Sequence, residues 1–220
     1  MKLREIDFGN VLGASGVQGF FGEGYWFHKA WSLFGLLDFK SITFVAKTAT
    51  LLPHKGNMSL TRSYTPKNPF PGCVKIKLRR GVMLNSIGLS NPGLGALLDT
   101  GKWQERTKPF FLSIMSLADT SQKRLEEFSI MVEMIGLCKD SFSAPFGLQI
   151  NLSCPNTGHN PQELIGESAK VLEIANTLGV QLMLKYSIAS APIQAILQLN
   201  NNSDCDAICV SNTLPFGWTG

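Results

Sequence analysis

The segment Ile150–Asn160, INLSCPNTGHN, places one thiol among three amide side chains directly after the apolar run FGLQI. A zinc site would need more thiols or imidazoles nearby, and a disulfide would need a partner and an oxidising compartment. A free thiol has a pKa of about 8.5, so a modest lowering makes Cys154 a usable base near neutral pH. The alternative is an inert buried cysteine. We therefore expect a working thiol where a strand ends.

Two lysines end apolar strand-like runs in the same way. Lys47 follows ITFVA, and Lys185 follows LML. A lysine is costly to bury unless it meets an anion or a polar ligand, although a single lysine at a strand end can simply reach solvent. Together the two lysines indicate a ligand.

Four asparagines lie near strand ends or in turns. They are Asn85, Asn151, Asn156 and Asn212. An amide offers both a donor and an acceptor, so several amides can bracket a flat heterocycle that carries alternating N–H and C=O groups. Asparagine is also common in turns for purely local reasons. As a group, these four favour a binding site. The three histidines, in contrast, show no spacing typical of a triad or a metal site, and we expect no metal.

These side chains need a scaffold of repeated strand-then-helix units. Strand-like runs are expected at 10–17, 41–50, 109–116, 146–154, 180–187 and 206–213, and helices around 25–37, at 121–138, from Pro161 to Gly179 and around 192–199. The strands are apolar throughout, which is typical of a parallel sheet covered on both faces. The absence of a G-x-G-x-x-G motif after the first strand weakens a dinucleotide fold.

The fold class predicted is α/β, a β/α (TIM-type) barrel like those of FMN oxidoreductases, with about six of the eight units in this chain. Polar residues at the carboxyl ends of strands would then share one face: Ser15, Lys47, Ser113, Asn151, Lys185 and Asn212. We expect one domain over 1–220 that is C-terminally incomplete, because a closed barrel needs eight strands. The proline-containing segment 63–81 is expected to be an excursion loop between the second and third strands, and 83–95 to continue it as a turn-rich loop.

Composition supports a globular protein: 44% of the residues are hydrophobic, 16% are charged, and the net charge is +4. The run KIKLRR alternates basic and apolar residues, as a half-exposed strand does, so no nucleic-acid partner is expected. Five cysteines without a C-x-x-C motif suggest neither zinc nor a disulfide framework. Without a signal peptide or a membrane-length apolar stretch, we expect a cytoplasmic protein that is not bound to a membrane. The aromatic segment 19–37, which glycines and charges interrupt, is expected to form a surface helix that covers the barrel, or a loop and helix over its bottom, rather than a membrane anchor.

The motif NLSCPNT resembles the active-site motif of dihydroorotate dehydrogenases. Further segments match the same family in order: ASG at 14–16, AKTAT with GN over 47–57, NSIGLSNPG at 85–93, LKYS at 184–187 and VSNT at 210–213. The resemblance covers nearly the whole chain. It implies an FMN-dependent β/α barrel that oxidises dihydroorotate to orotate in pyrimidine biosynthesis.

The resemblance also implies a role for each matched residue. Cys154 would be the base that removes the C5 proton, and the C6 hydride would pass to flavin N5. Lys47 would lie against flavin and substrate. The substrate-binding residues would be Asn85, Gly88, Leu89, Asn151, Asn156, Asn212 and Thr213. The flavin would be lined by Ala14, Ser15, Lys47, Asn151 and Lys185.

A cysteine base, with no N-terminal membrane-associating extension, resembles the soluble class 1 enzymes. These use fumarate directly or pass electrons to NAD through a separate iron–sulfur flavoprotein subunit. The partners expected are therefore the small molecules dihydroorotate and orotate, and either a second copy of the chain or an electron-transfer subunit. Two alternatives stay open. One is a truncated or degenerate homologue with a binding or scaffold role and no catalysis of its own. The other is a different FMN barrel that acts on a pyrimidine.

Overall fold

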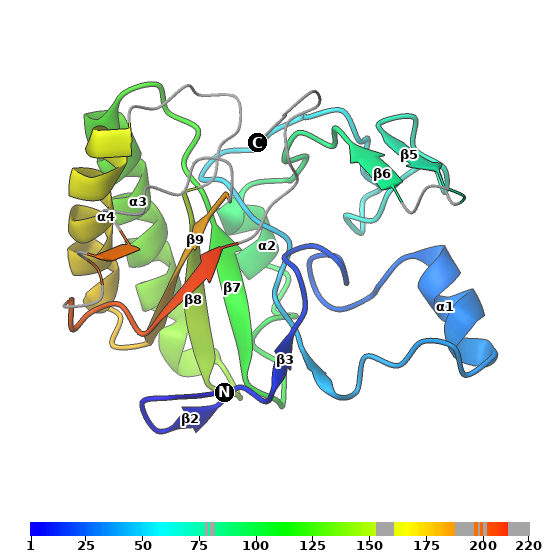
Figure 1. Ribbon diagram of the computed structural model, residues 1–220, viewed down its shortest axis with the longest axis horizontal. Coiled ribbons are helices and arrows are strands. Elements are labelled where there is room, and N and C mark those ends of the chain that lie inside the picture. The colour runs from blue at the N-terminus through cyan, green and yellow to red at the C-terminus, as the bar shows by residue number, and fades with distance from the viewer. Residues whose placement is uncertain are drawn as a thin grey trace.

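The centre of the molecule is a four-stranded parallel sheet, in the order β10-β9-β8-β7. Its strands are β7 (Phe110–Ile114), β8 (Phe146–Asn151), β9 (Gln181–Tyr186) and β10 (Ala207–Val210). The computed structural model describes residues 1–77, 79, 82–152, 161–187, 196–197, 199 and 202–210. Figure 1 shows the sheet with helices on one side and a smaller group of elements on the other.

Parallel pairing continues beyond β7 toward the N-terminus. Val45 and Ala49 form parallel bridges to Phe111 and Ile114 of β7. The strands β3 (Val11–Leu12) and β4 (Ile42–Thr43), which precede this segment, pair in parallel with each other. Neighbouring strands thus follow chain order across the described part of the sheet. This confirms the α/β fold with a parallel sheet.

The central strands are as buried as their apolar composition predicted. All residues of β7 and β8 are buried, as expected for parallel strands that are covered on both faces. Residues of alternating parity point to opposite faces. Phe110, Leu112 and Ile114 join one hydrophobic cluster, whereas Phe111 joins a second cluster on the other face.

Helices cover the first of these faces, which we call the outer face. They are α2 (Leu94–Leu98), α3 (Ser121–Cys138) and α4 (Pro161–Asn176), with a 3₁₀ turn η2 (Lys139–Ser141) after α3. Helix α3 has the predicted bounds, because Phe128, Val132 and Ile135 recur at helical spacing and are buried. Thr120 caps it by accepting a hydrogen bond from the Lys123 amide at 3.3 Å. Helix α4 begins at the predicted Pro161 and ends before Gly179, whose φ is +62°.

The opposite, inner face carries a smaller apolar cluster near the amino ends of the strands. Its buried members are Leu3, Phe8, Val45, Phe111 and Met183. The antiparallel hairpin of β1 (Lys2–Leu3) and β2 (Ile6–Asp7) lies beneath these strand ends (Figure 1). Arg4 Nε of the hairpin donates to Asp206 Oδ1 at 2.8 Å, and Asp206 Oδ2 accepts from the Leu182 amide at 2.8 Å. The hairpin is thereby fixed to the start of β10.

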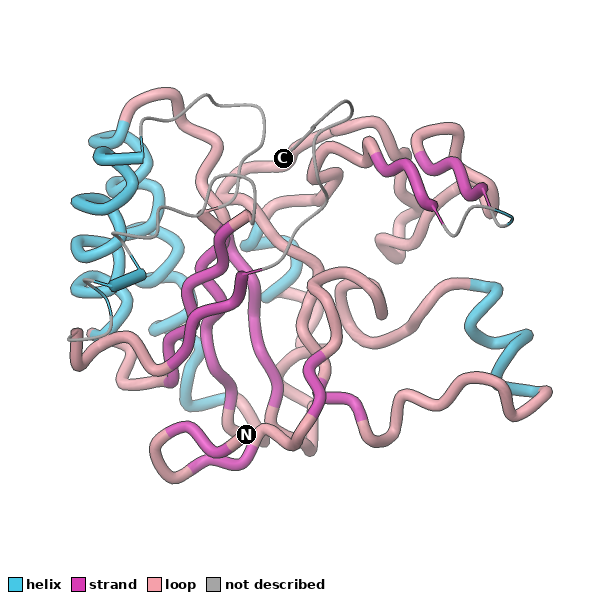
Figure 2. The backbone as a smooth tube through the Cα atoms, in the orientation of Figure 1, coloured by secondary structure: helices cyan, strands magenta, loops and turns pink. Residues whose placement is uncertain are grey.

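Helix α1 (Trp26–Leu33) and strand β6 (Val82–Asn85) differ from expectation, whereas β5 (Val74–Lys77) is the exposed strand that the alternation in KIKLRR indicated. Helix α1 falls in the predicted range but has no buried residue, so it does not pack over the sheet as a covering helix would. The predicted excursion at 63–81 contains β5. That strand pairs with β6, where a turn-rich loop was expected. Figure 2 shows how much loop connects these elements to the sheet.

Candidate active site

Above the inner apolar cluster, the same face of the sheet becomes polar. Ser113 and Lys185 each lie two residues beyond an inward member of their own strand, Phe111 and Met183. Gln149 and Asn151 of β8 are their register partners and so share this face. Along these strands, the inward side chains near the amino ends are apolar, as Phe111 and Met183 are. Those near the carboxyl ends are polar. The described carboxyl ends therefore form the candidate site, as the sequence predicted.

A row of hydrogen bonds crosses this face. Ser15 Oγ donates to the Ala46 carbonyl at 2.8 Å and lies 3.0 Å from Thr48 Oγ1. Thr48 Oγ1 lies 2.9 Å from Ser113 Oγ, which donates to Gln149 Oε1 at 3.3 Å. Gln149 Nε2 contacts Met183 Sδ at 3.4 Å. From Ser15 to Met183 of β9 the row runs through side chains, and at its other end it reaches the backbone carbonyl of Ala46.

An irregularity in the strand segment at 45–49 makes this row possible. Val45 pairs with Phe111 and Ala49 pairs with Ile114, so four steps on one strand oppose three on the other. Such an extra residue is a β-bulge, and bulges redirect side chains. Ala49 accordingly packs in the outer cluster, and Thr48 turns inward to reach Ser113. Sequence reasoning missed both Thr48 and Gln149; the signal for Gln149 was a lone amide inside an apolar strand.

Lys47 lies within the bulge and is buried, with 8% of its surface exposed. Its Nζ donates a hydrogen bond to the Ser90 carbonyl and lies 4.6 Å from the centre of the Phe20 ring. Burial lowers the pKa of Lys47 to about 8, and the negative charge of Glu23 opposes that shift. Among the described residues no carboxylate comes within ion-pair distance of this ammonium. The site thus holds a cation that is only partly compensated.

A second lysine follows the same pattern on β9. Lys185 aligns with Asn151 of β8 on one side and with Cys209 of β10 on the other. Lys185 is half-buried, and desolvation lowers its pKa, with the Cys209 thiol acting in the opposite direction. Asn151 is buried. The structure therefore places Asn151 and Lys185 side by side at the carboxyl ends of two neighbouring strands.

The loops around Ser90 form the rim of the site beside Lys47. Gly88 and Leu89 both have positive φ values, +65° and +55°, which makes a tight turn of exposed backbone. Asn85 lies at the end of β6, exposed, and its Oδ1 accepts from the Ile87 amide at 3.0 Å. The Asn85 side chain thus stabilises the turn that follows β6. Ala14 is exposed next to Ser15.

The glycine of the GN pair explains how the rim is packed. A side chain on Gly56 would place its Cβ closer than 3.0 Å to Ser90 Oγ and to the carbonyls of Gly88 and Ile87. Next to it, Asn57 Nδ2 donates to the Ser86 carbonyl at 2.7 Å. Beneath the rim, Asn91 Oδ1 accepts from the Gly93 amide at 2.9 Å, and its Nδ2 donates to Thr50 Oγ1 at 2.9 Å. Sequence reasoning did not single out Asn91, because nothing separates it from an ordinary turn asparagine.

Four predicted site residues lie outside the described residues. They are Cys154, Asn156, Asn212 and Thr213. Their predicted roles therefore stay predictions. Asn151 ends β8, and Leu152 is the last described residue before the segment that contains Cys154 and Asn156.

The described residues suit a cofactor that carries negative charge. Lys47 is a desolvated cation without a carboxylate partner among the described residues, and Lys185 is a second cation on the same strand ends. Gly16 approaches closely, because a Cβ at this position would lie 3.2 Å from Lys47 Cγ. No group of three or more histidine, cysteine, aspartate or glutamate side chains that could hold a metal ion occurs within the described ranges.

Comparison with known proteins places the chain in a family. Residues 1–215 match the family model described as "Dihydroorotate dehydrogenase". The chain belongs to the dihydroorotate dehydrogenase family. It is therefore related to oxidoreductases, and the resemblance stated from NLSCPNT and its companion motifs is confirmed at family level.

Individual relatives of this dihydroorotate dehydrogenase family member are distant. Proteins named "Dihydroorotate dehydrogenase B (NAD(+)), catalytic subunit" from Bacillus cereus (strain G9842) and Bacillus anthracis (strain CDC 684 / NRRL 3495) are each 29% identical to it over 157 residues. The match spans 67% of this chain and 45% of each relative. No helix in the described part of the chain is both long and apolar enough to cross a membrane.

Proposed function

We propose that this chain is the FMN-binding part of a dihydroorotate dehydrogenase built on a β/α barrel, which oxidises dihydroorotate to orotate in pyrimidine biosynthesis. The family match over residues 1–215 and the parallel strands in chain order support this proposal. The observation that carries it is Lys47, a buried ammonium with its pKa lowered to about 8 beside the polar carboxyl ends of the sheet.

The reaction removes a proton from C5 and a hydride from C6 of dihydroorotate, which leaves the C5–C6 double bond of orotate. FMN, when bound, supplies the hydride acceptor at its N5 atom. Cys154 is proposed to take the C5 proton, since a thiol whose pKa is near neutral is an effective base. Lys47 is proposed to hold positive charge against the reduced flavin and the substrate.

The substrate's carboxylate and ring need separate contacts. The turn at Gly88 and Leu89 presents backbone at the rim next to Ser90, which Lys47 already contacts. We assign the carboxylate to this turn. Asn151, at the end of β8, is proposed to hold the pyrimidine ring together with Asn156, Asn212 and Thr213, and Asn85 is proposed to close the rim. Ala14, Ser15 and Lys185 are proposed to line the flavin.

The electron acceptor is proposed to be NAD, reached through a separate subunit. The Bacillus relatives are named catalytic subunits of an NAD(+) enzyme, which supports a second, electron-transferring chain. This corresponds to the soluble class 1 type, with a cysteine base and a cytoplasmic location. A purified partner that restores dihydroorotate-dependent NAD reduction would be the direct evidence.

Flavin reduction tests the proposal. The purified chain is mixed with FMN, and dihydroorotate is added without oxygen while the flavin absorbance is followed. We expect FMN to bind and to bleach with dihydroorotate but not with dihydrouracil. A chain that binds no FMN, or whose flavin dihydrouracil bleaches equally well, would contradict the assignment.

The base is tested separately. Cys154→Ala should slow bleaching by roughly 100-fold or more near neutral pH, because general-base catalysis typically contributes that much, and FMN affinity should stay unchanged. Cys73→Ala, at a half-buried cysteine beside the β5–β6 hairpin, is the matched control and should bleach at the parent rate. Full-speed bleaching by Cys154→Ala would remove Cys154 from the mechanism.

A further inference from the structure

Residues 16–25, which we call the glycine loop, lie between the candidate-site residue Ser15 and helix α1. The loop contains glycines with positive φ values of +66° to +90°: Gly16, Gly19, Gly22 and Gly24. This backbone conformation lets the chain turn tightly several times within a short stretch. The turns bring separate parts of the loop against one residue, Lys47.

Three residues of the glycine loop contact Lys47 directly. The Lys47 amide donates to the Gly19 carbonyl at 3.0 Å, and the Lys47 Nζ lies 4.6 Å from the centre of the Phe20 ring. Gly16 packs against the aliphatic stem, because a Cβ at this position would lie 3.2 Å from Lys47 Cγ. The backbone, the stem and the ammonium of Lys47 are therefore each contacted by this one loop.

Glu23 fixes the part of the loop that contacts the lysine. Its Oε1 accepts from the Phe20 amide at 3.2 Å, and its Oε2 accepts from the Phe21 amide at 2.8 Å. The peptide between Gly19 and Phe20 thus bonds to both partners: its carbonyl accepts from Lys47, and its N–H donates to Glu23. A Cβ on Gly19 would overlap the Glu23 carboxylate, so only glycine leaves room for this arrangement.

Two side chains from residues 101–108 hold the same part of the loop from the other side. Trp103 Nε1 donates to the Phe20 carbonyl at 2.6 Å, and Arg106 Nη1 donates to the Phe21 carbonyl at 2.9 Å. Both carbonyls and both amides of this phenylalanine pair are therefore bonded. The Phe20 ring that faces the ammonium is held in one position.

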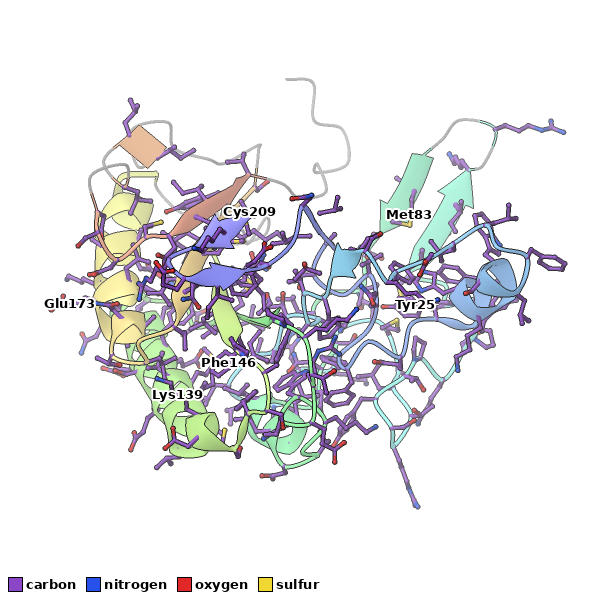
Figure 3. The ribbon with its side chains drawn as sticks, turned by 90° about the horizontal axis from the view of Figure 1, so that it is seen from below. Tyr25, Met83, Lys139, Phe146, Glu173 and Cys209 are labelled. Atoms are coloured by element: carbon purple, nitrogen blue, oxygen red, sulfur yellow. The ribbon has the colours of Figure 1, made fainter. Side chains whose placement is uncertain are left out.

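Tyr25 ties the end of the glycine loop back to its start. Its hydroxyl donates to the Gly16 carbonyl at 2.9 Å. Figure 3 shows Tyr25 beside α1, across the molecule from Glu173 of α4, so the loop lies apart from the helix-covered face. Burial raises the pKa of Tyr25 to about 12, which leaves its hydroxyl neutral at ordinary pH. Glu23 is the only acidic residue of the loop.

The charge of Glu23 acts on Lys47 although no ion pair joins them. It opposes the lowering of the lysine pKa by burial. The other described elements beside Lys47, the rim residues 87–91 and strand β7, contain no titratable side chain. Glu23 is thus the carboxylate on which the charge state of Lys47 depends.

We propose that Glu23 is a positioning residue that acts on the flavin reaction through Lys47. It holds Gly19 and Phe20 against the lysine, and its charge keeps the ammonium protonated to a higher pH than burial alone would allow. Only a protonated lysine can stabilise negative charge on the reduced flavin and the substrate. The inference rests on the role proposed above for Lys47 and extends it to a residue that needs no contact with flavin or substrate.

Two variants separate the charge of Glu23 from its hydrogen bonds. Glu23→Gln keeps the shape and one acceptor oxygen but removes the charge. We expect the alkaline limb of the pH profile for flavin bleaching by dihydroorotate to move down by about half a pH unit or more. Glu23→Asp keeps the charge on a shorter side chain, so it should slow bleaching and leave the limb in place. Glu133→Gln, exposed on α3, is the matched control and should match the parent.

A second measurement needs neither flavin nor substrate. The free energy of unfolding in urea should rise with pH while Lys47 is neutral in the folded chain and protonated in the unfolded chain, from about pH 8 in the parent. In Glu23→Gln the folded pKa of Lys47 is lower, so this rise should begin at a lower pH. Glu23→Gln/Lys47→Met should show the same pH dependence as Lys47→Met alone, because the titrating lysine is gone.

The inference is overturned if Glu23→Gln leaves both the alkaline limb and the start of the stability rise at the parent pH. It is also overturned if Glu23→Asp moves the limb as far as Glu23→Gln does, since the charge would then be irrelevant. If Glu23→Gln fails to fold, the position of the limb in Glu23→Asp decides alone. A parent chain that bleaches normally while these shifts are missing leaves the proposed function intact, whereas a parent that does not bleach FMN with dihydroorotate removes both.

Discussion

The Nζ of Lys47 donates a hydrogen bond to the carbonyl oxygen of Ser90, 43 residues further along the chain. This contact joins the bulged strand segment to the rim loop that carries the Gly88–Leu89 turn. A buried cation thus positions the loop to which we assign the substrate's carboxylate. Its removal should affect catalysis more than folding.

Lys47→Met should fold and lose activity. Methionine keeps most of the length of lysine without the charge, so we expect flavin bleaching by dihydroorotate to slow about 100-fold or more. FMN affinity, measured by fluorescence titration, should fall less than the bleaching rate. Lys170→Met on the exposed face of α4 is the control. Parent-like bleaching in Lys47→Met would remove the lysine from the site.

Lys47 should also make stability depend on pH. Its pKa lies near 8 in the folded chain against an ordinary 10.5, so the unfolded chain binds more protons between these values. The free energy of unfolding should therefore rise with pH across this window, by roughly 3 kcal/mol from this residue. Below about pH 8 both states are protonated and the contribution is constant.

Urea unfolding of the parent and of Lys47→Met checks this. The parent should gain stability relative to the variant between about pH 8 and about pH 10. Burial raises the pKa of Tyr25 and Tyr186 to about 12, so measurements at higher pH would add an opposing effect. Equal slopes for the two proteins would show that Lys47 keeps an ordinary pKa.

Arg124 and Glu167 form a buried pair between α3 and α4. Arg124 Nε lies 2.8 Å from Glu167 Oε1, its second contact to Oε2 is 2.6 Å, and its Nη1 donates to the carbonyls of Ala118 and Asp119 at 3.2 Å. Glu167→Ala should destabilise the chain by about 3–5 kcal/mol, because it leaves a buried cation without its carboxylate. Glu173→Ala, exposed on the same helix, is the control for urea unfolding. A cost of under about 1 kcal/mol would show that the pair is dispensable.

Gly56→Ala should disturb the rim. Its Cβ would crowd Ser90 and the Gly88 carbonyl, and the φ of +50° is unfavourable for alanine, so we expect a loss of more than about 2 kcal/mol. Gly101→Ala has a similar φ of +71° but open space, and should cost only about 1 kcal/mol. Urea midpoints of the two variants separate crowding from backbone strain. Equal losses would mean that the rim can move aside.

The sequence predicted the covered face of the sheet far better than its edges. Helix α3 and strands β7 to β9 were recognisable because their patterns are long and their burial is complete. The five residues of α2 were missed, since a helix that short after a proline and a glycine has no readable periodicity. The sequence indicates a helix near α1, but composition does not show that this helix would have no buried residue.

The sequence indicated which strand ends carry the candidate site, but it gave less information on how the side chains there are arranged. Lys47, Asn151 and Lys185 lie at the carboxyl ends of strands as expected. The bulge that turns Thr48 inward depends on how two strands pair, so no local pattern indicates it.

The row from Ser15 to Gln149 has a property that follows from counting protons. The three hydroxyls of Ser15, Thr48 and Ser113 supply three protons, and four contacts need one: to Ala46, two between hydroxyls, and to Gln149. One of the four contacts is therefore always without a proton. When a hydroxyl rotates, a different contact in the row becomes the one without a proton. Charge that develops above the sheet can then be met by reorienting dipoles alone, with every heavy atom in place. The floor of the site can therefore adjust its local electric field by rotating hydroxyl groups.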